Sequence, residues 1–135
     1  MHNGKVAILT EKVFYDNPQF TTKEIERTVA ALGFEQVLFI PVEPGDQVGH
    51  ADGIVRFLST DVLLVNDYES AGFRAYQVHL LDRLAEVSSH TTIVPFPWLC
   101  SAERTGRVWS AVGVYINFVQ TTRGILFPVF VEPED

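Results

Sequence analysis

A polar loop near the middle of the chain holds the residue types best suited to chemistry. The segment Gly45 to Gly53 (GDQVGHADG) contains His50 and Asp52, which are separated by one residue. If residues 50 to 52 are extended, the two side chains lie on the same face, because strand side chains repeat every two residues. An imidazole beside a carboxylate suits general acid–base chemistry, and the carboxylate can also bind a cation or a guanidinium group. The alternative is a surface loop in which His50 is simply solvated or hydrogen-bonded.

Polar residues that follow this loop are candidates for ligand binding. Arg56 and Phe57 come soon after the His-x-Asp segment, and Arg56 can orient or bind a carboxylate. The alternative is an exposed arginine on a half-solvated strand. Asn66 lies at the end of the next expected strand, where it either lines the same cleft or begins a turn.

Other chemistries have less support. His-x-Asp supplies only two metal ligands and the other histidines show no companion spacing, so we expect no metal. The chain has no Walker loop, GxGxxG, GxSxG or CxxC motif, and we expect no cofactor. The single cysteine, Cys100, lies in a Pro/Trp loop near Arg104 and Arg107, which can activate a thiol, but a lone cysteine is more often inert.

The composition limits the classes of function. The 135 residues are 47% hydrophobic and 20% charged, which is typical of one globular domain and excludes a disordered or collagen-like chain. A formal net charge of −7 argues against nucleic acid or an anionic membrane as the main partner. One cysteine permits no internal disulfide, and no segment has the features of a signal peptide or a transmembrane helix. We therefore expect a cytoplasmic protein with no nucleic-acid and no membrane partner.

The elements expected to hold the loop begin with a β-α-β unit. Its parts are a strand at 5–9, a helix at 22–32 and a strand at 36–40, with a loop at 14–20. Thr21 followed by Glu24 is a capping-box pattern, and Gly33 suits the left-handed residue that ends a helix. The core face of this helix is expected to carry Ile25, Val29 and Leu32.

A second unit has the order strand, strand, helix, strand. It comprises strands at 53–58 and 61–65 joined by a tight turn at Ser59-Thr60, a helix at about 71–87 capped by Ser70, and a strand at 91–94. The buried stripe of that helix is expected to contain Phe73, Leu80, Leu81, Leu84 and Val87.

Both ends of the chain carry incomplete hairpins. Strands at 114–120 and 125–131 are expected to pair around Thr122-Arg123-Gly124. Asn3-Gly4 is a strong signal for a hairpin turn, yet only two residues precede it, so we expect its partner strand to be absent. The alternative is a frayed terminus or a cloning remnant. These ends favour repeated β-β-α-β modules of which the outer ones are cut short.

Over longer segments the chain resembles the pentein superfamily, specifically the agmatine deiminase and bacterial peptidylarginine deiminase family of guanidino-group-modifying hydrolases. The resemblance rests on LTEKVFYDNPQF, on EPGDQVGHADGIVRFL followed by VLLVNDY, and on YINFVQTTRGILFPVF. Members fold as a five-bladed α/β propeller of β-β-α-β modules around a central substrate channel. The resemblance therefore implies an α/β fold with about two modules of a pentein-type propeller. It implies a single partial domain at 1–135, with modules at about 1–41 and 53–95 and the start of a third at 114–131.

The resemblance also implies roles for individual residues. In the family a cysteine attacks the guanidinium carbon, a histidine acts as acid and base, and acidic residues bind the guanidinium nitrogens. His50 matches the catalytic histidine, and Asp52 matches a guanidinium-binding acid. Arg56 and Phe57 match motif positions whose role the resemblance leaves open. We take Asp52, Arg56 and Asn66 as the expected substrate-binding residues.

The nucleophile of the family has no match in this chain. Cys100 lies before the YINF strand, whereas the family's cysteine follows the PVF strand, and the first guanidinium-binding acid lies upstream of residue 1. We therefore expect a fragment of a deiminase-type hydrolase, or one part of a split enzyme, that is inactive alone. Without a nucleophile, His50 and Asp52 can bind a guanidinium but cannot cleave it. The expected ligand is a guanidino small molecule or a peptidyl arginine.

Two other hypotheses stay open. The chain is alternatively a non-catalytic binding or oligomer-assembly module of the same fold, whose open sheet edges pair with a second copy or a complementing chain. A metal-dependent hydrolase that uses His50 and Asp52 ranks last.

Overall fold

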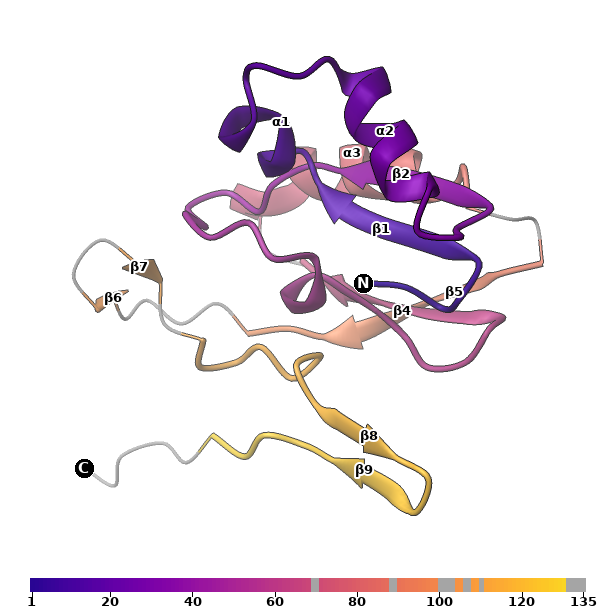
Figure 1. Cartoon of the computed structure of the whole chain (residues 1–135). Helices are drawn as coiled ribbons and strands as arrows, with labels where there is room; N and C mark the ends of the chain where they lie inside the picture. Colours follow the sequence, from indigo (N-terminus) through magenta and orange to yellow (C-terminus); the bar gives the residue numbers. More distant parts are fainter. Residues whose placement is uncertain (69–70, 88–89, 100–103, 106–107, 110, 131–135) are drawn as a thin grey trace.

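The computed structural model describes residues 1–68, 71–87, 90–99, 104–105, 108–109 and 111–130. They form a mixed α/β structure in which two strand–helix–strand units with parallel strands share one core (Figure 1). Ser70, the expected helix cap, and Cys100 lie outside the described residues.

The first unit confirms the expected β-α-β order. Strand β1 (Val6–Thr10) pairs in parallel with β2 (Gln36–Ile40), and helix α2 (Thr22–Ala30) lies between them in the chain. The capping box is formed, since the Glu24 amide donates to the Thr21 hydroxyl and the Thr21 amide donates to the Glu24 carboxylate. Gly33 has a φ of +104°, the left-handed conformation expected of it.

Two details of this unit differ from the sequence prediction. Helix α2 ends at Ala30, and Leu32, expected in the core, is 77% exposed in the turn that follows. The segment expected to be a loop begins with a short helix, α1 (Lys12–Asp16). Tertiary packing explains this helix, because the ring of Phe14 lies 4.6 Å from the ring of Phe39 on β2.

The Asn3-Gly4 turn is also formed, so the alternative of a frayed terminus is wrong. Among the described residues no strand pairs with β1 across this turn, where only an isolated bridge forms. Gly4 has a φ of +94°, and the Asn3 side-chain oxygen accepts hydrogen bonds from the amides of Lys5 and Val6. Met1 and Ile8 exchange two backbone hydrogen bonds, and His2 forms an isolated antiparallel bridge with Ala7. Met1 and His2, the two residues before the turn, are therefore enough to form this antiparallel bridge.

The second unit confirms the expected strand, strand, helix, strand order. Strand β3 (Val55–Phe57) is antiparallel to β4 (Val62–Asp67), and β4 is parallel to β5 (Thr92–Pro97). The connection between β3 and β4 contains Ser59 and Thr60 as expected, but it is one residue longer than a two-residue turn, because the Leu58 amide donates to the Val62 carbonyl and Phe57 pairs with Leu63. Strand β5 extends further than expected, through Pro95 and Pro97. Its place at the end of the β3-β4-β5 order explains this, because an edge strand tolerates missing amide donors.

Helix α3 (Arg74–Leu84) crosses from β4 to β5 and is preceded by a 3-10 turn, η2 (Ala71–Phe73). Leu80 and Leu84 are fully buried and Val87 is buried beyond the helix end. Leu81, expected in the buried stripe, is 39% exposed. It lies about 100° around the helix from Leu80, which places it beside the stripe instead of within it.

The β3-β4-β5 sheet has apolar side chains on both faces. One face shares the main core with β1, β2 and α3, which includes Val6, Ile8, Leu38, Ile40, Val55, Phe57, Leu63, Val65, Leu80 and Leu84. On the other face Leu64 packs with Ile116 and Phe118 in a smaller cluster. The sheet is therefore enclosed between two layers where these clusters lie.

The C-terminal part contains the expected hairpin with shorter strands. Strands β8 (Val119–Thr121) and β9 (Gly124–Leu126) pair antiparallel, and residues 114–118 are not strand but contain a turn at 115–116. Two-residue strands β6 (Arg104–Thr105) and β7 (Val108–Trp109) precede it (Figure 1). Within the described ranges, no helix has the length and apolar character needed to cross a membrane.

Candidate functional site

His50 and Asp52 lie in the connection between β2 and β3. His50 has an extended backbone and comes immediately before a 3-10 turn, η1 (Ala51–Gly53), which contains Asp52. The expectation of an extended segment at 50–52 is therefore wrong. Both side chains nevertheless line the same two cavities, so the structure brings them together through a turn instead of a strand.

The loop before His50 is fixed by local hydrogen bonds. The Asp46 carboxylate accepts the amides of Val48 and Gly49 at 2.7 and 2.8 Å. The hydroxyl of Thr10, at the end of β1, donates to the carbonyl of Gly49. Gly49 has a φ of +70°, a left-handed conformation that favours glycine. The backbone that leads into His50 is thus held both by its own loop and by β1.

Asn66, expected to bind substrate, lies under the η1 turn. It is fully buried on β4, its amide donates to the Ile54 carbonyl at 3.0 Å, and its side-chain nitrogen donates to the Gly53 carbonyl at 2.7 Å. Its side-chain oxygen has no hydrogen-bond partner among the described residues. Asn66 therefore fixes the turn that carries Asp52.

A partly buried carboxylate that the sequence analysis did not single out completes this network. The Tyr68 hydroxyl accepts from the Asn66 side chain at 3.3 Å and donates to Glu43 at 2.8 Å. The pKa of Glu43 is raised to about 7, mainly by burial; the Tyr68 hydrogen bond opposes the shift, and the charge of the nearby Asp46 adds to it. The EPGD sequence contained Glu43, but no spacing rule connects it to a tyrosine 25 positions later.

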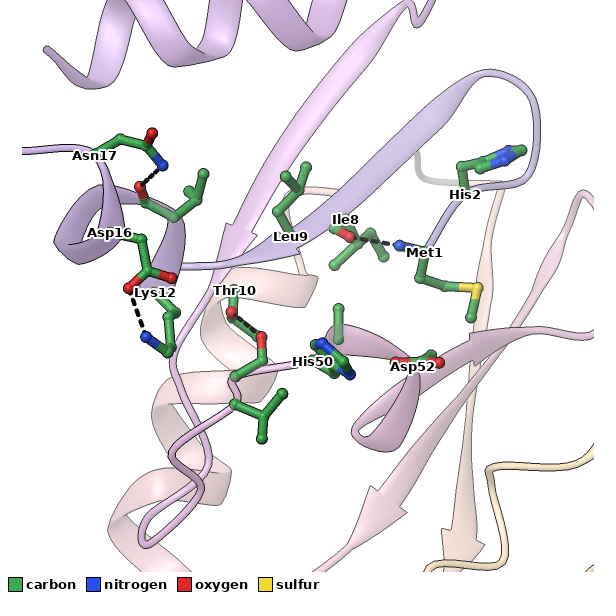
Figure 2. A pocket seen from close by; sticks show the side chains of 14 residues that line it. Met1, His2, Ile8, Leu9, Thr10, Lys12, Asp16, Asn17, His50 and Asp52 are labelled. Carbon is green, nitrogen blue, oxygen red and sulfur yellow. Dashed lines mark hydrogen bonds and ion pairs between the residues drawn. The ribbon is translucent and has the colours of Figure 1, made fainter. Parts of the chain in front are cut away.

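The first cavity lies on the β1 side of His50 and has a volume of about 670 Å³. Figure 2 shows His50 between Asp52 on one side and the α1 residues Lys12 and Asp16 on the other. Burial lowers the pKa of the Met1 amine, and the charge of Asp52 opposes that shift, which indicates that Asp52 faces this cavity.

The second cavity shares His50 and Asp52 with the first and has a volume of about 380 Å³. Glu43 and Asp46 add two further carboxyl groups to its wall. No lysine or arginine lines it among the residues that the structure describes. Asp52 thus lies where carboxyl groups concentrate, which favours a cationic ligand, and His50 can donate or accept a proton beside it.

Arg56, the other expected substrate-binding residue, is not brought to these cavities. It lies on the opposite face of β3 from Val55 and Phe57, and its guanidinium carbon is 4.4 Å from the centre of the Phe118 ring. This cation–π contact ties the segment after β7 to the sheet. Arg56 does not line either cavity.

The described part of the chain offers no group of three His, Cys, Asp or Glu side chains placed to hold a metal ion. Cys100, the one thiol of the chain, lies outside the described residues. The site as described combines a proton-transfer group with anionic groups that suit a cation.

Comparison with solved structures shows the fold. The agmatine deiminase of C. jejuni with substrate bound matches with a TM-score of 0.69 at 18% identity, over 96% of this chain and 40% of that one. The agmatine deiminase of Enterococcus faecalis matches with a TM-score of 0.72 at 17% identity, over 96% and 43%. A candidate arginine deiminase from Porphyromonas gingivalis gives 0.74 at 20% identity, over 97% and 42%.

The chain thus spans about two fifths of the length of these solved structures. No match was found among curated protein sequences. Residues 2–135 match the family of Porphyromonas-type peptidyl-arginine deiminases, which is nearly the whole chain. The chain therefore belongs to the Porphyromonas-type peptidyl-arginine deiminase family.

Proposed function

We propose that this chain supplies the histidine–aspartate part of a guanidino-group hydrolase, in which Asp52 binds the guanidinium and His50 transfers protons. The observation that carries the proposal is the position of both side chains on the wall shared by two cavities, one of them lined by three acidic residues. A guanidinium stays protonated in proteins and offers paired N–H donors that match a carboxylate. Family membership supports the same ligand class.

The element order supports a finer architecture, which we propose as two β-β-α-β modules of a pentein-type propeller at about 1–41 and 53–95. Strands β3 and β4, helix α3 and strand β5 follow that order. In the first module the bridge between His2 and Ala7 lies where an additional strand would pair with β1. Residues 114–131 would begin a third module of the same partial domain.

In this proposal Asn66 is a positioning residue, because it is fully buried and bonds the η1 turn. Arg56 has a structural role through Phe118. Cleavage of a guanidinium C–N bond also needs a nucleophile, and no described residue of either cavity is a cysteine. We therefore propose that the chain binds guanidines but does not hydrolyse them alone.

Calorimetric titration of the chain with guanidino ligands tests the binding. We expect at least one of agmatine, L-arginine and Nα-acetyl-argininamide to bind, and Asp52→Asn to weaken that binding by roughly tenfold or more. Asp61→Asn is the matched control, because Asp61 is an exposed carboxylate in the β3–β4 turn and lines neither cavity. No binding by any of the three ligands would contradict the proposed function.

An ammonia-release assay tests the expected lack of turnover. Release that is abolished by His50→Ala would show that the chain is active alone. Release that is abolished by Cys100→Ser would identify Cys100 as a nucleophile after all.

The C-terminal hairpin supports the second candidate function, which is assembly. Exposed apolar side chains include Val119 and Leu126 on its strands and Phe127 and Val129 in the segment after β9. Isolated exposed residues are ordinary, but a group of this kind on an open two-stranded hairpin suits a partner that adds strands. Light scattering should then show a dimer that Leu126→Asp dissociates, and a monomer at all concentrations would reject self-assembly.

A further inference from the structure

The first cavity holds an ion pair that the proposed function does not use. Lys12 and Asp16 line the cavity one helical turn apart on α1, and Lys12 Nζ lies 2.6 Å from Asp16 Oδ1. In Figure 2 this pair lies on one side of His50 and Asp52 lies on the other. The cavity therefore has a carboxylate at the guanidinium end and adjacent opposite charges at the other end.

The stem of Lys12 is held against the backbone next to His50. A Cβ added to Gly49 would lie 2.7 Å from Lys12 Cβ and 2.6 Å from Lys12 Cδ, so the two residues are in close contact. Gly49 directly precedes His50, and neighbouring Cα atoms are about 3.8 Å apart, so the Lys12 stem lies close to the backbone of His50. The Lys12 side chain is only 27% exposed, against 68% for Lys5. Lys12 thus forms a fixed part of the cavity wall.

We propose that the Lys12–Asp16 pair recognises the charged end of free L-arginine, an inference that rests on the proposed function. With the guanidinium at Asp52, the aliphatic chain runs past His50 along the first cavity. The α-carboxylate then faces Lys12 and the α-ammonium faces Asp16. A cavity of about 670 Å³ is within the usual range for a small-molecule site and has room for this ligand.

The same charges disfavour the related guanidines. Agmatine ends in an ammonium group alone, which Asp16 attracts but Lys12 repels. An arginine inside a peptide has neither terminal charge at this position, so the ion pair would lose solvent without gaining a partner. The site therefore favours the free amino acid over both.

Calorimetric titration of the 135-residue chain with four ligands tests the proposal. L-Arginine carries both end charges, the α-ammonium and the α-carboxylate. L-Argininamide and agmatine keep only the ammonium, and Nα-acetyl-L-arginine keeps only the carboxylate. L-Arginine should bind roughly tenfold or more tightly than agmatine, because a charge-assisted hydrogen bond contributes about that factor. L-Argininamide should bind like agmatine, and Nα-acetyl-L-arginine should lose the contribution of Asp16 only.

Substitutions at Lys12 separate the charge from the packing. Lys12→Met keeps a long stem beside Gly49 and should reduce the affinity for arginine to that for agmatine. Lys12→Gln is a second uncharged variant, and Lys12→Arg should keep the preference. Lys5→Met is the matched control, because Lys5 pairs with Glu35 at 3.5 Å and lines neither cavity. It should leave all four affinities unchanged.

The outcomes distinguish this inference from the proposed function. If agmatine binds as tightly as arginine, or if both uncharged Lys12 variants keep the preference for arginine, the inference is overturned. The proposed function stands in either case if Asp52→Asn still weakens binding. If none of the four ligands and no Nα-acetyl-argininamide binds, the proposed function is overturned, and the inference with it.

Discussion

The segment that carries His50 and Asp52 is supported on its two sides by different kinds of interaction. On the β4 side the support is a buried hydrogen-bond network that runs from Gly53 through Asn66 and Tyr68 to Glu43. On the α1 side it is the stem of Lys12, a side chain that is 27% exposed, which packs beside Gly49 and ends in an ion pair with Asp16.

This difference implies that the β4 side contributes mainly to the stability of the fold and the α1 side mainly to ligand recognition. Breaking a buried hydrogen bond leaves a polar group without water, so the β4 side should contribute to the free energy of unfolding. A partly exposed ion pair contributes little stability, since water already solvates both charges. The α1 side can therefore exchange partners with a ligand at small cost, while the β4 side keeps Asp52 in place.

The largest expected effect is that of Asn66→Ala. It removes both side-chain hydrogen bonds, leaves the Gly53 carbonyl without its donor, and opens a small cavity. We expect the free energy of unfolding to fall by about 3 kcal/mol. Urea denaturation followed by tryptophan fluorescence measures the change. Asn117→Ala is the control, because Asn117 is exposed, and it should change stability by less than about 0.5 kcal/mol. Equal effects of the two variants would show that the β4 side is not a rigid support.

Local interactions were the features of the fold that the sequence could predict. The capping box of Thr21 and Glu24 spans three residues, and the strand at Gln36–Ile40 is bounded by a proline, so both follow from short-range rules. The proximity of His50 and Asp52 was also predicted, although through an extended segment where the structure has a 3-10 turn.

Contacts between distant segments could not be predicted. Glu43 and Tyr68 are 25 positions apart, and the hydroxyl of Thr10 reaches the Gly49 carbonyl across 39 positions. No periodicity connects such residues, because the fold brings them together only after both units pack on one core. The α1 helix was missed for the same reason, since its packing partner Phe39 lies on β2.

On the α1 side, Gly49→Ala should have the next largest effect. A residue with a side chain is strained at a φ of +70°, and the new methyl group would overlap the Lys12 stem. We expect a loss of about 2 kcal/mol in the free energy of unfolding and a weaker preference for arginine, because Lys12 must move. Gly53→Ala is the control, since its Cβ would meet nothing within 4 Å. A stable Gly49→Ala protein with unchanged ligand affinities would show that this close contact positions nothing.

On the β4 side, Glu43→Gln tests how the hydrogen-bond network makes the stability of the fold depend on pH. The pKa of Glu43 is raised from 4.5 to about 7 in the folded chain, so the folded state binds more protons than the unfolded state between these values. The contribution of Glu43 to stability is therefore lost as the pH rises from about 4.5 to about 7. Glutamine mimics the neutral form, so Glu43→Gln should match the parent protein at pH 4.5 and be more stable above pH 7, by on the order of 2 kcal/mol.

Thermal unfolding between pH 4 and 8 measures this difference, and Tyr68→Phe sharpens it. The Tyr68 hydroxyl lowers the pKa of Glu43, so its removal should move the loss of stability to higher pH. Parallel pH profiles for the parent and the Glu43→Gln protein would contradict the raised pKa. They would also mean that Glu43 is solvated in the folded chain. The β4 side and the Lys12 side would then both be supported by groups in contact with water, and they would differ only in how exposed those groups are.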